Sequence, residues 1–185
     1  MTKIKTILFV DLETTGLNPG AHDVVEITAY LTDLHGWHVY RKVSTLVCGD
    51  LTRADPAAMA VNGITAEDLV GAPRGEEVGR QLADILQDDR YEVVAWAGQN
   101  VGAFDLPFLR AMAPSALGTH NRYVPYHAID NASLAWPLFL KGEVPNLKLE
   151  TLCTYFGVPN AGAHRTEADV KRAVAVYRHL MGWGV

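Results

Sequence analysis

The stretch ILFVDLETTGL, residues 7–17, decides the fold: an apolar run leads into two acidic residues and then into a glycine. The apolar run at 7–10 is typical of a strand buried on both faces, because such strands are hydrophobic without interruption. If the strand spans residues 4–13, its period of two places Asp11 and Glu13 on one face. Two carboxylates at that spacing either repel each other or share a cation, so the stretch predicts a metal site at a strand end.

Two more strands are expected after the glycine turn. Residues 24–32 and residues 37–47 are both rich in β-branched and aromatic residues, which favour extended structure. Gly36, between them, is typical of a hairpin turn. The first part of the chain therefore predicts an antiparallel meander of three strands.

Helical patterns dominate from residue 55 onward. Asp55-Pro56 is typical of a helix start, Asn62-Gly63 of a helix end, and Thr65 with Asp68 fits the cap of a further short helix. Helices are also expected over 76–86, 104–112, 131–140, 147–156 (with Asn146 as its cap) and 170–180, and short strands over 91–97 and 126–129. This order predicts a single α/β domain over residues 1–185, with a mixed central β-sheet flanked by helices.

The composition fits an intracellular globular protein. Of the 185 residues, 49% are hydrophobic, which supports one core of ordinary size. No apolar run approaches the roughly 18–20 residues of a membrane span, and the N-terminal sequence lacks a signal-peptide cleavage pattern. We therefore expect a cytoplasmic protein without a membrane partner, in which Cys48 and Cys153 are packing residues.

The net charge of the chain limits the ways in which the protein can bind nucleic acid. A net charge of −5 and a pI near 5.8 argue against a protein that holds nucleic acid on a broad basic surface. They do not exclude a nucleic-acid enzyme, because bound cations would neutralise several of the acidic side chains. Lys171, Arg172 and Arg178 form either a local basic group or a solvated helix face.

Three more residues are candidates for the same site, and each has a plainer explanation. Asp105 follows the strand expected at 91–97, where it also suits the entry of a helix. Asp169 lies three residues after Thr166, as in a capping box. His164 precedes Asp169 by a separation of about 140° on a helix, so it belongs in the preceding loop, where a lone histidine is usually solvated.

Taken together, these residues indicate a metal-dependent hydrolase. Four carboxylates at one edge of a sheet suit Mg²⁺ or Mn²⁺ far better than Zn²⁺, since no cysteine or histidine cluster accompanies them. Two such ions about 4 Å apart activate a water molecule and stabilise the leaving oxygen of a phosphodiester. His164, which titrates near neutrality, is suited to take the proton from that water.

Three motifs resemble those of the DnaQ-like DEDD nucleases and occur in the same order. They are DLETTGL at 11–17, Asn100 with Phe104-Asp105, and HRTEAD at 164–169, whose His-x₄-Asp pattern is that of the DEDDh subgroup. The resemblance extends from residue 7 to about residue 178 and implies a ribonuclease-H-like fold with 3′ to 5′ exonucleolysis by two Mg²⁺ or Mn²⁺ ions. It implies that His164 is the general base and that the metals are held by Asp11, Glu13, Asp105 and Asp169.

The resemblance also implies contacts with the terminal nucleotide, at Thr14, Thr15, Gly16, Leu17, Asn100 and Phe104. A glycine at position 16 allows close approach of the backbone. Leu17 and Phe104 offer apolar faces on which bases stack without sequence preference, although both also suit a core.

The chain departs from the family pattern at three points. Gln99 stands where many members have histidine, and Val61 stands where relatives often have histidine. Asp105 lies five residues after Asn100, one more than in many members, which is similar to the oligoribonuclease branch. These departures leave the subfamily open and do not affect the metal-binding residues.

We therefore expect an enzyme: a metal-dependent 3′ to 5′ exonuclease that acts on single-stranded ends, with DNA favoured over RNA. One alternative is a proofreading or repair subunit that works with a polymerase or another replication or repair protein. Another is a ribonuclease similar to oligoribonuclease or RNase T. A third is a catalytically silent nucleic-acid-binding module, which would have lost an acidic residue or the base.

Overall fold

The computed structural model describes residues 2–117, 128–160 and 165–184. It contains a five-stranded sheet with the order β3-β2-β1-β4-β5. The strands are β1 (Ile4–Thr14), β2 (Val24–Thr32), β3 (Val39–Leu46), β4 (Tyr91–Gly98) and β5 (Ala128–Asp130). The first three pair antiparallel, whereas β4 is parallel to β1 and β5 is parallel to β4. The sheet is therefore mixed, as the sequence predicts.

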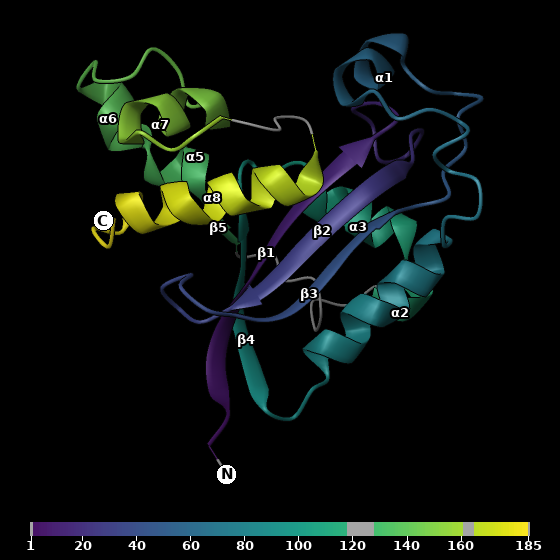
Figure 1. The fold of residues 1–185 in the computed structure, drawn as a ribbon, viewed down its shortest axis with the longest axis horizontal. Helices are drawn as coiled ribbons and strands as arrows, with labels where there is room; N and C mark the ends of the chain where they lie inside the picture. Colours follow the sequence, from purple (N-terminus) through teal and green to yellow (C-terminus); the bar gives the residue numbers. More distant parts are fainter. Residues whose placement is uncertain (1, 118–127, 161–164, 185) are drawn as a thin grey trace.

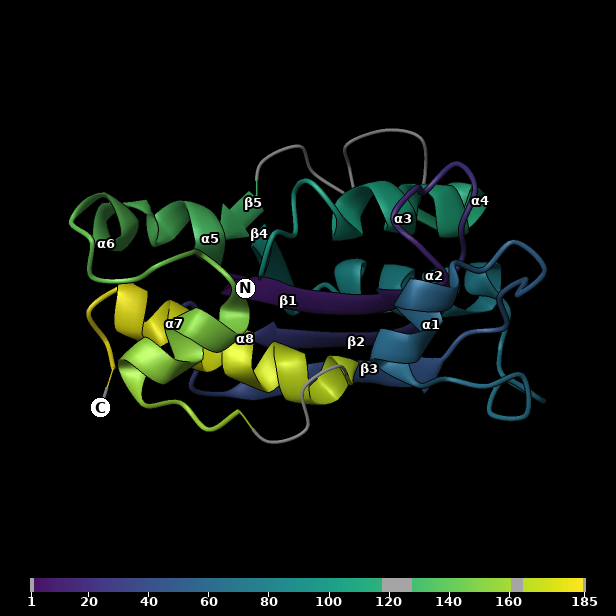
Figure 2. The same ribbon diagram turned by 90° about the horizontal axis from the view of Figure 1, so that it is seen from above.

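Helices cover both faces of this sheet, and Figure 2 shows the resulting layers. On one face lies α8 (Thr166–Leu180), whose Val170, Val174 and Tyr177 pack on Ile7 and Phe9 of β1. The opposite face is covered by α2 (Gly75–Leu86), α3 (Asp105–Met112) and α4 (Pro114–Leu117). Because both faces are covered, β2 is buried along its whole length.

The remaining helices lie at the edges of the layers (Figure 1). They are α1 (Pro56–Asn62), α5 (Asn131–Leu134), α6 (Trp136–Leu140) and α7 (Leu149–Phe156). Helix α1 begins where the sequence predicts, because the Asp55 carboxylate accepts the N–H of Ala57 at 2.8 Å. It ends at Gly63, which adopts the left-handed conformation with φ of 67°.

Several local predictions are wrong, each for a physical reason. Residues 66–71 form turns rather than a short helix, since the Asp68 carboxylate accepts both the N–H and the hydroxyl of Thr65. The helix expected over 131–140 is two short helices that meet at Ala135 and Trp136, just before Pro137. Thr166 is the first residue of α8 rather than its N-cap, so Asp169 does not belong to a capping box.

The cysteines differ from each other. Cys153 is fully buried in the cluster that joins α7 to α8, as expected for a packing residue. Cys48 is exposed, so the expectation for it is wrong. Within the described residues, no helix has the length and apolar character needed to cross a membrane.

Candidate active site

Three carboxylates meet where β1 passes under the first turn of α8. Side-chain oxygens of Asp11, Glu13 and Asp169 lie within 4.8 Å of one another. Asp11 and Glu13 pair with Thr28 and Glu26 on β2, and their side chains share the α8 face of the sheet. The structure therefore brings together three of the four acidic residues that the sequence predicts as metal ligands.

Asp105, the fourth, lies against this group as the first residue of α3. It is 2% exposed, and its carboxylate accepts the backbone N–H of Leu12, which lies between Asp11 and Glu13. Its Oδ1 atom has no hydrogen-bond partner among the described residues. A buried carboxylate oxygen without a donor is costly unless a cation or a water molecule occupies its other side.

The negative charges of these carboxylates repel one another. Burial first, and then the charges of Asp105 and Glu13, raise the pKa of Asp11 well above its usual value. Burial and the charge of Glu26 raise the pKa of Glu13 to about 7, and burial raises that of Asp105. Several ionised carboxylates at this spacing need positive charge between them, and an all-oxygen donor set fits Mg²⁺ or Mn²⁺.

Arg172, one turn after Asp169 on α8, supplies part of that positive charge. Its guanidinium donates through Nη2 to Asp169 Oδ1 and through Nη1 to Asn160 Oδ1, the latter at 3.1 Å. It is 5% exposed, and its charge lowers the pKa of Asp11. Sequence reasoning placed Arg172 in a basic group or on a solvated face; its position three residues after Asp169 is the signal that relates it to the site.

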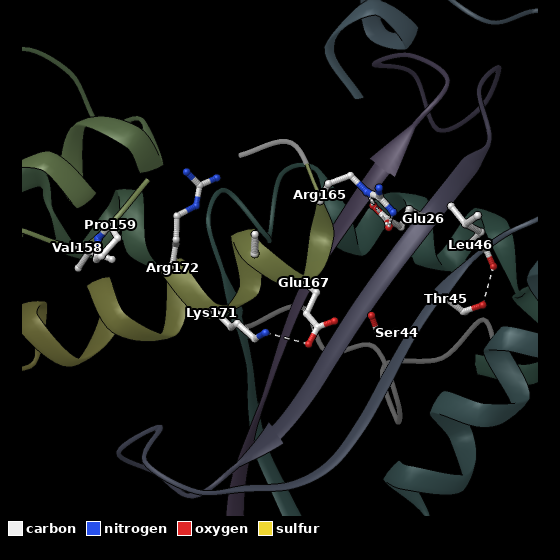
Figure 3. A pocket seen from close by; sticks show the side chains of 11 residues that line it. Glu26, Ser44, Thr45, Leu46, Val158, Pro159, Arg165, Glu167, Lys171 and Arg172 are labelled. Atoms are coloured by element: carbon white, nitrogen blue, oxygen red, sulfur yellow. Dashed lines mark hydrogen bonds and ion pairs between the residues drawn. The ribbon is translucent and has the colours of Figure 1, made fainter. Parts of the chain in front are cut away.

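A second support that the sequence did not reveal is Glu26. Its carboxylate accepts Arg165 Nη2 at 2.7 Å and the backbone N–H of Thr166 at 3.2 Å, and Figure 3 shows Arg165 reaching it across the face of the sheet. The Thr166 hydroxyl also contacts that of Thr28 at 2.9 Å. These bonds hold the start of α8 on β2 and so fix where Asp169 lies. The alternation of side chains along β2, which gives Glu26 the same facing as Thr28, is the signal that would identify it.

The same view shows a groove between α8 and β3, of about 840 Å³. Its charged side chains include Arg165, which pairs with Glu26, and Lys171, which pairs with Glu167 at 3.0 Å. Lys42 of β3 also reaches Glu167, at 3.4 Å. These cations are already neutralised within the protein, so the groove offers little free positive charge.

Beside the carboxylates, on the side of α1, is an apolar pocket of about 290 Å³. Leu17, Val61 and Phe104 line it together with Glu13 and Thr14. Leu17 and Val61 are 77% and 55% exposed, so neither is a core residue. Phe104 lines this pocket and also packs partly against the core.

The turn after β1 accounts for the neighbouring sequence candidates. Thr14 donates its hydroxyl to Gly16 O at 2.6 Å, and Thr15 Oγ1 accepts the N–H of Asp23 at 2.9 Å. A Cβ atom at position 16 would come within 2.6 Å of the His22 ring. The packing of the turn itself therefore favours glycine at this position. Both threonine hydroxyls shape this turn.

Asn100 begins the loop that leads from β4 into α3. It adopts a left-handed conformation with φ of 61°, which is uncommon outside glycine and found at functional sites. Its N–H donates to Asp130 Oδ1 at 2.9 Å, and its carbonyl accepts the N–H of Phe104 at 3.1 Å. His164, the predicted base, lies outside the described residues.

Comparison with known proteins agrees with this geometry. The sequence model of the exonuclease family, RNase T, matches residues 8–177. A solved structure of exonuclease I, described in terms of how processivity is achieved, has a TM-score of 0.79 at 19% identity and covers 96% of this chain and 41% of that one. No curated protein matches the sequence.

Two further similar structures are complexes. Zinc-bound exonuclease I of E. coli with single-stranded DNA has a TM-score of 0.78 at 19% identity, covering 96% of this chain and 40% of that one. Product-bound exonuclease I has a TM-score of 0.78 at 19% identity, covering 97% of this chain and 43% of that one. At this identity the similarity shows a shared fold, and the chain spans about two fifths of the length of these structures.

Proposed function

The chain belongs to the exonuclease family, the DnaQ-like DEDDh enzymes with a ribonuclease-H-like fold, and from this membership we propose that it removes nucleoside monophosphates from the 3′ end of single-stranded nucleic acid. The observation that carries the proposal is the convergence of Asp11, Glu13 and Asp169 beside the buried Asp105. DNA is proposed over RNA, which is consistent with the single-stranded DNA bound to the similar exonuclease I of E. coli.

The metal-binding role falls to the four carboxylates. Enzymes of this family depend on divalent metal, and we assign two Mg²⁺ or Mn²⁺ ions to Asp11, Glu13, Asp105 and Asp169. When bound, such ions polarise the scissile phosphate and lower the pKa of an attacking water. Arg172 and Arg165 hold Asp169 and the start of α8 in place for this task.

His164 is assigned as the general base that removes the proton from the attacking water. The assignment rests on its position five residues before Asp169 in the sequence motif. A histidine suits the task because its pKa lies near neutral pH.

The pocket beside α1 is assigned to the 3′-terminal nucleotide. Its exposed Leu17 and Val61 and the ring of Phe104 present apolar surface to an unpaired base, and Glu13 on its wall connects it to the carboxylates. Apolar and aromatic faces bind bases without reading their sequence. An end that is not base-paired fits such a pocket, because a base in a duplex is already stacked and paired.

A second candidate is the same chemistry in a proofreading or repair subunit with a polymerase partner. The observation that favours it is the net charge of −5, which gives the chain little general attraction for nucleic acid. The stand-alone enzyme and the subunit are distinguished by measuring the hydrolysis rate with and without added candidate polymerases. Stimulation on long strands, with unchanged hydrolysis of short ones, would favour the subunit.

The proposal is tested by a gel time course with 5′-labelled single-stranded DNA and RNA of matched sequence, in Mg²⁺, Mn²⁺ or EDTA. A ladder that shortens from the 3′ end, is absent in EDTA and is absent in Asp169→Ala supports the exonuclease. Asp89→Ala is the matched control, because the Asp89 side chain is 98% exposed and outside the site. Faster cleavage of RNA would instead indicate a ribonuclease, and binding without turnover in any metal would indicate a silent module.

A further inference from the structure

A second cleft opens on the other side of the loop between β4 and α3. It has a volume of about 550 Å³ and is lined by Gln99, Asn100, Asp130, Trp136, Leu147 and Lys148, among others. We call it the Trp136 cleft. Its size lies within the range of about 300–1,000 Å³ that is common for ligand pockets.

The Trp136 cleft shares one loop with the apolar pocket beside α1, which is lined by Leu17, Val61 and Phe104 and which we call the Leu17 pocket. Asn100, at the start of this loop, lines the cleft, and Phe104, at its end, lines the pocket. Asp105 follows directly. Burial is the main cause of its raised pKa, and the charge of Asp130, in the wall of the cleft, adds to it. The two cavities therefore lie on either side of the loop that leads into Asp105.

The arrangement of the helices agrees with this placement of the two cavities. Figures 1 and 2 both show α1, beside the Leu17 pocket, and α5 with α6, beside the Trp136 cleft, toward opposite sides of the molecule. Figure 2 shows β1 between α8 on one face and α3 on the other. Side-chain oxygens of Asp11 and Glu13, on this strand, lie within 4.8 Å of an oxygen of Asp169 on α8. A strand whose 3′ nucleotide occupies the Leu17 pocket would continue over the carboxylates toward the cleft.

The chemistry of the cleft suits a nucleotide. Trp136 is 48% exposed at the start of α6, although its ring is held edge-to-face against Phe139 with centroids 5.4 Å apart. Lys148 is exposed, and its ammonium has no ion pair within the described parts of the chain. An exposed indole beside a free cation is the combination that binds one base and one phosphate.

The wall of the cleft is fixed and holds an unused acceptor. Gln99 Nε2 donates to Leu147 O at 2.8 Å, whereas Gln99 Oε1 is buried without a partner among the described residues. The Asp130 carboxylate accepts the N–H groups of Asn100 and Ala132, each at 2.9 Å, so its negative charge is partly compensated.

We propose that the Trp136 cleft binds the nucleotides on the 5′ side of the scissile phosphate, with a base stacked on Trp136 and a phosphate beside Lys148. The inference rests on the proposed exonuclease function and adds to it the direction of the strand across the site. It also explains how a chain of net negative charge holds a single strand: two cavities flank the metal site, and one of them carries an unpaired lysine.

Binding is measured first, without turnover. We expect Trp136→Ala to weaken binding of a 5′-fluorescein-labelled dT₁₀ oligonucleotide in Ca²⁺ about tenfold, as measured by fluorescence anisotropy. Lys148→Ala weakens it about threefold and makes the dependence on salt less steep. Trp37→Ala and Lys5→Ala are the matched controls. Trp37 is 52% exposed between β2 and β3, beyond Thr32, which pairs with Ile7 rather than with Asp11, and Lys5 is exposed on β1.

Hydrolysis of a substrate without 5′ nucleotides separates the cleft from the catalytic machinery. For the p-nitrophenyl ester of thymidine 5′-monophosphate, p-nitrophenol replaces the upstream nucleotide. Trp136→Ala is expected to hydrolyse this ester within about twofold of the parent rate, while its kcat/KM on dT₁₀ falls about tenfold. Trp136→Phe is expected to restore most of the binding.

Three results would overturn the inference. The first is unchanged dT₁₀ binding in both cleft variants. The second is equal loss on the ester and on dT₁₀, which would make Trp136 a support of the fold or of the carboxylates. The third is equal weakening by the control variants. If the parent protein hydrolyses neither substrate, the proposed function fails, while the binding comparison still decides whether the cleft holds single strands.

Discussion

Arg165 and Glu26 form an ion pair in which two guanidinium nitrogens meet one carboxylate, with Nη2 at 2.7 Å and Nε at 3.1 Å from Oε1. The carboxylate is nearly buried, whereas the Arg165 side chain is 59% exposed. Glu26 also lies directly across from Glu13 in the sheet. This pair therefore connects the start of α8, which carries Asp169, to β2, the strand that pairs with β1 and its Asp11 and Glu13.

Loss of Glu26 is expected to loosen the start of α8. Glu26→Ala removes the acceptor of Arg165 and of the Thr166 N–H, and should lower the free energy of unfolding by about 2 kcal/mol. Arg165→Met should cost less, because this side chain is largely exposed, yet it leaves Glu26 without its cation. Urea unfolding of both variants and of the double variant measures the coupling. Strictly additive costs would show that the pair does not act as a unit.

Arg172 is expected to stabilise the protein most when metal is absent. Arg172→Met leaves Asp169 beside Asp11 and Glu13 without its buried partner, and should cost about 3 kcal/mol in EDTA. Mn²⁺ should then raise the Tm of this variant more than that of the parent, since the ion takes over the same charge. Lys171→Met is the control, because Lys171 precedes Arg172 on α8 and its side chain is 63% exposed. If Mn²⁺ raises the Tm of Arg172→Met and of the parent protein equally, Arg172 does not contribute to the metal site.

Asp11→Asn is expected to remove activity while making the metal-free protein more stable. Loss of this proposed metal ligand should lower the rate by about 10³-fold or more, because metal-ion stabilisation of the transition state contributes several kcal/mol. The Tm in EDTA should rise, since the carboxyl group is buried against Asp105 and Glu13. Single-turnover kinetics and thermal unfolding check the two effects. An unchanged rate would remove Asp11 from the metal site.

The stability of the metal-free protein is expected to fall as pH rises. The pKa of Glu13 is about 7 in the folded chain, and those of Asp11 and Asp105 are also raised, so between about pH 4 and 7 the folded state holds more protons than the unfolded state. Protonation of these carboxyl groups stabilises the folded state at low pH, and this stabilisation is lost as the pH rises from about 4 to 7. The Tm in EDTA should be higher at pH 5 than at pH 8, with a smaller difference in Glu13→Gln. The same pH dependence in both proteins would contradict the assignment to Glu13.

His164→Ala is expected to lower the rate by about 10² to 10⁴ while leaving metal affinity unchanged, as for loss of a general base. Calorimetric titration with Mn²⁺ and single-turnover rates on dT₁₀ measure the two quantities. If the affinity for Mn²⁺ falls instead, His164 acts on the metal-binding residues rather than on the water.

The strands were largely predictable from sequence because their apolar runs are long and β-branched. β2 has the expected bounds, and β1 and β4 extend one residue further than expected. The failures lie where side chains bond to nearby backbone, as at Thr65 with Asp68, or where a proline divides a helical pattern, as at Pro137. Propensity over a window does not resolve such local bonds.

Within the candidate site, strand periodicity identified the facing of Asp11 and Glu13, and motif order suggested Asp105 and Asp169. What the sequence did not identify are the residues that support them. Glu26 and Arg172 act through partners far away in the chain or one helical turn away, and these pairings depend on where α8 crosses the sheet. The same holds for the Trp136 cleft, whose walls come from three separate segments.

Because α8 crosses β1, the acidic cluster joins position 11 to position 169. A ribosome adds these residues on the order of ten seconds apart, so an emerging chain holds Asp11 and Glu13 long before Asp169 exists. Contacts between such distant segments also form late, since closing a long loop is slow. We therefore expect a nascent chain to be inert toward nearby nucleic acid, and a product interrupted before α8 to remain so.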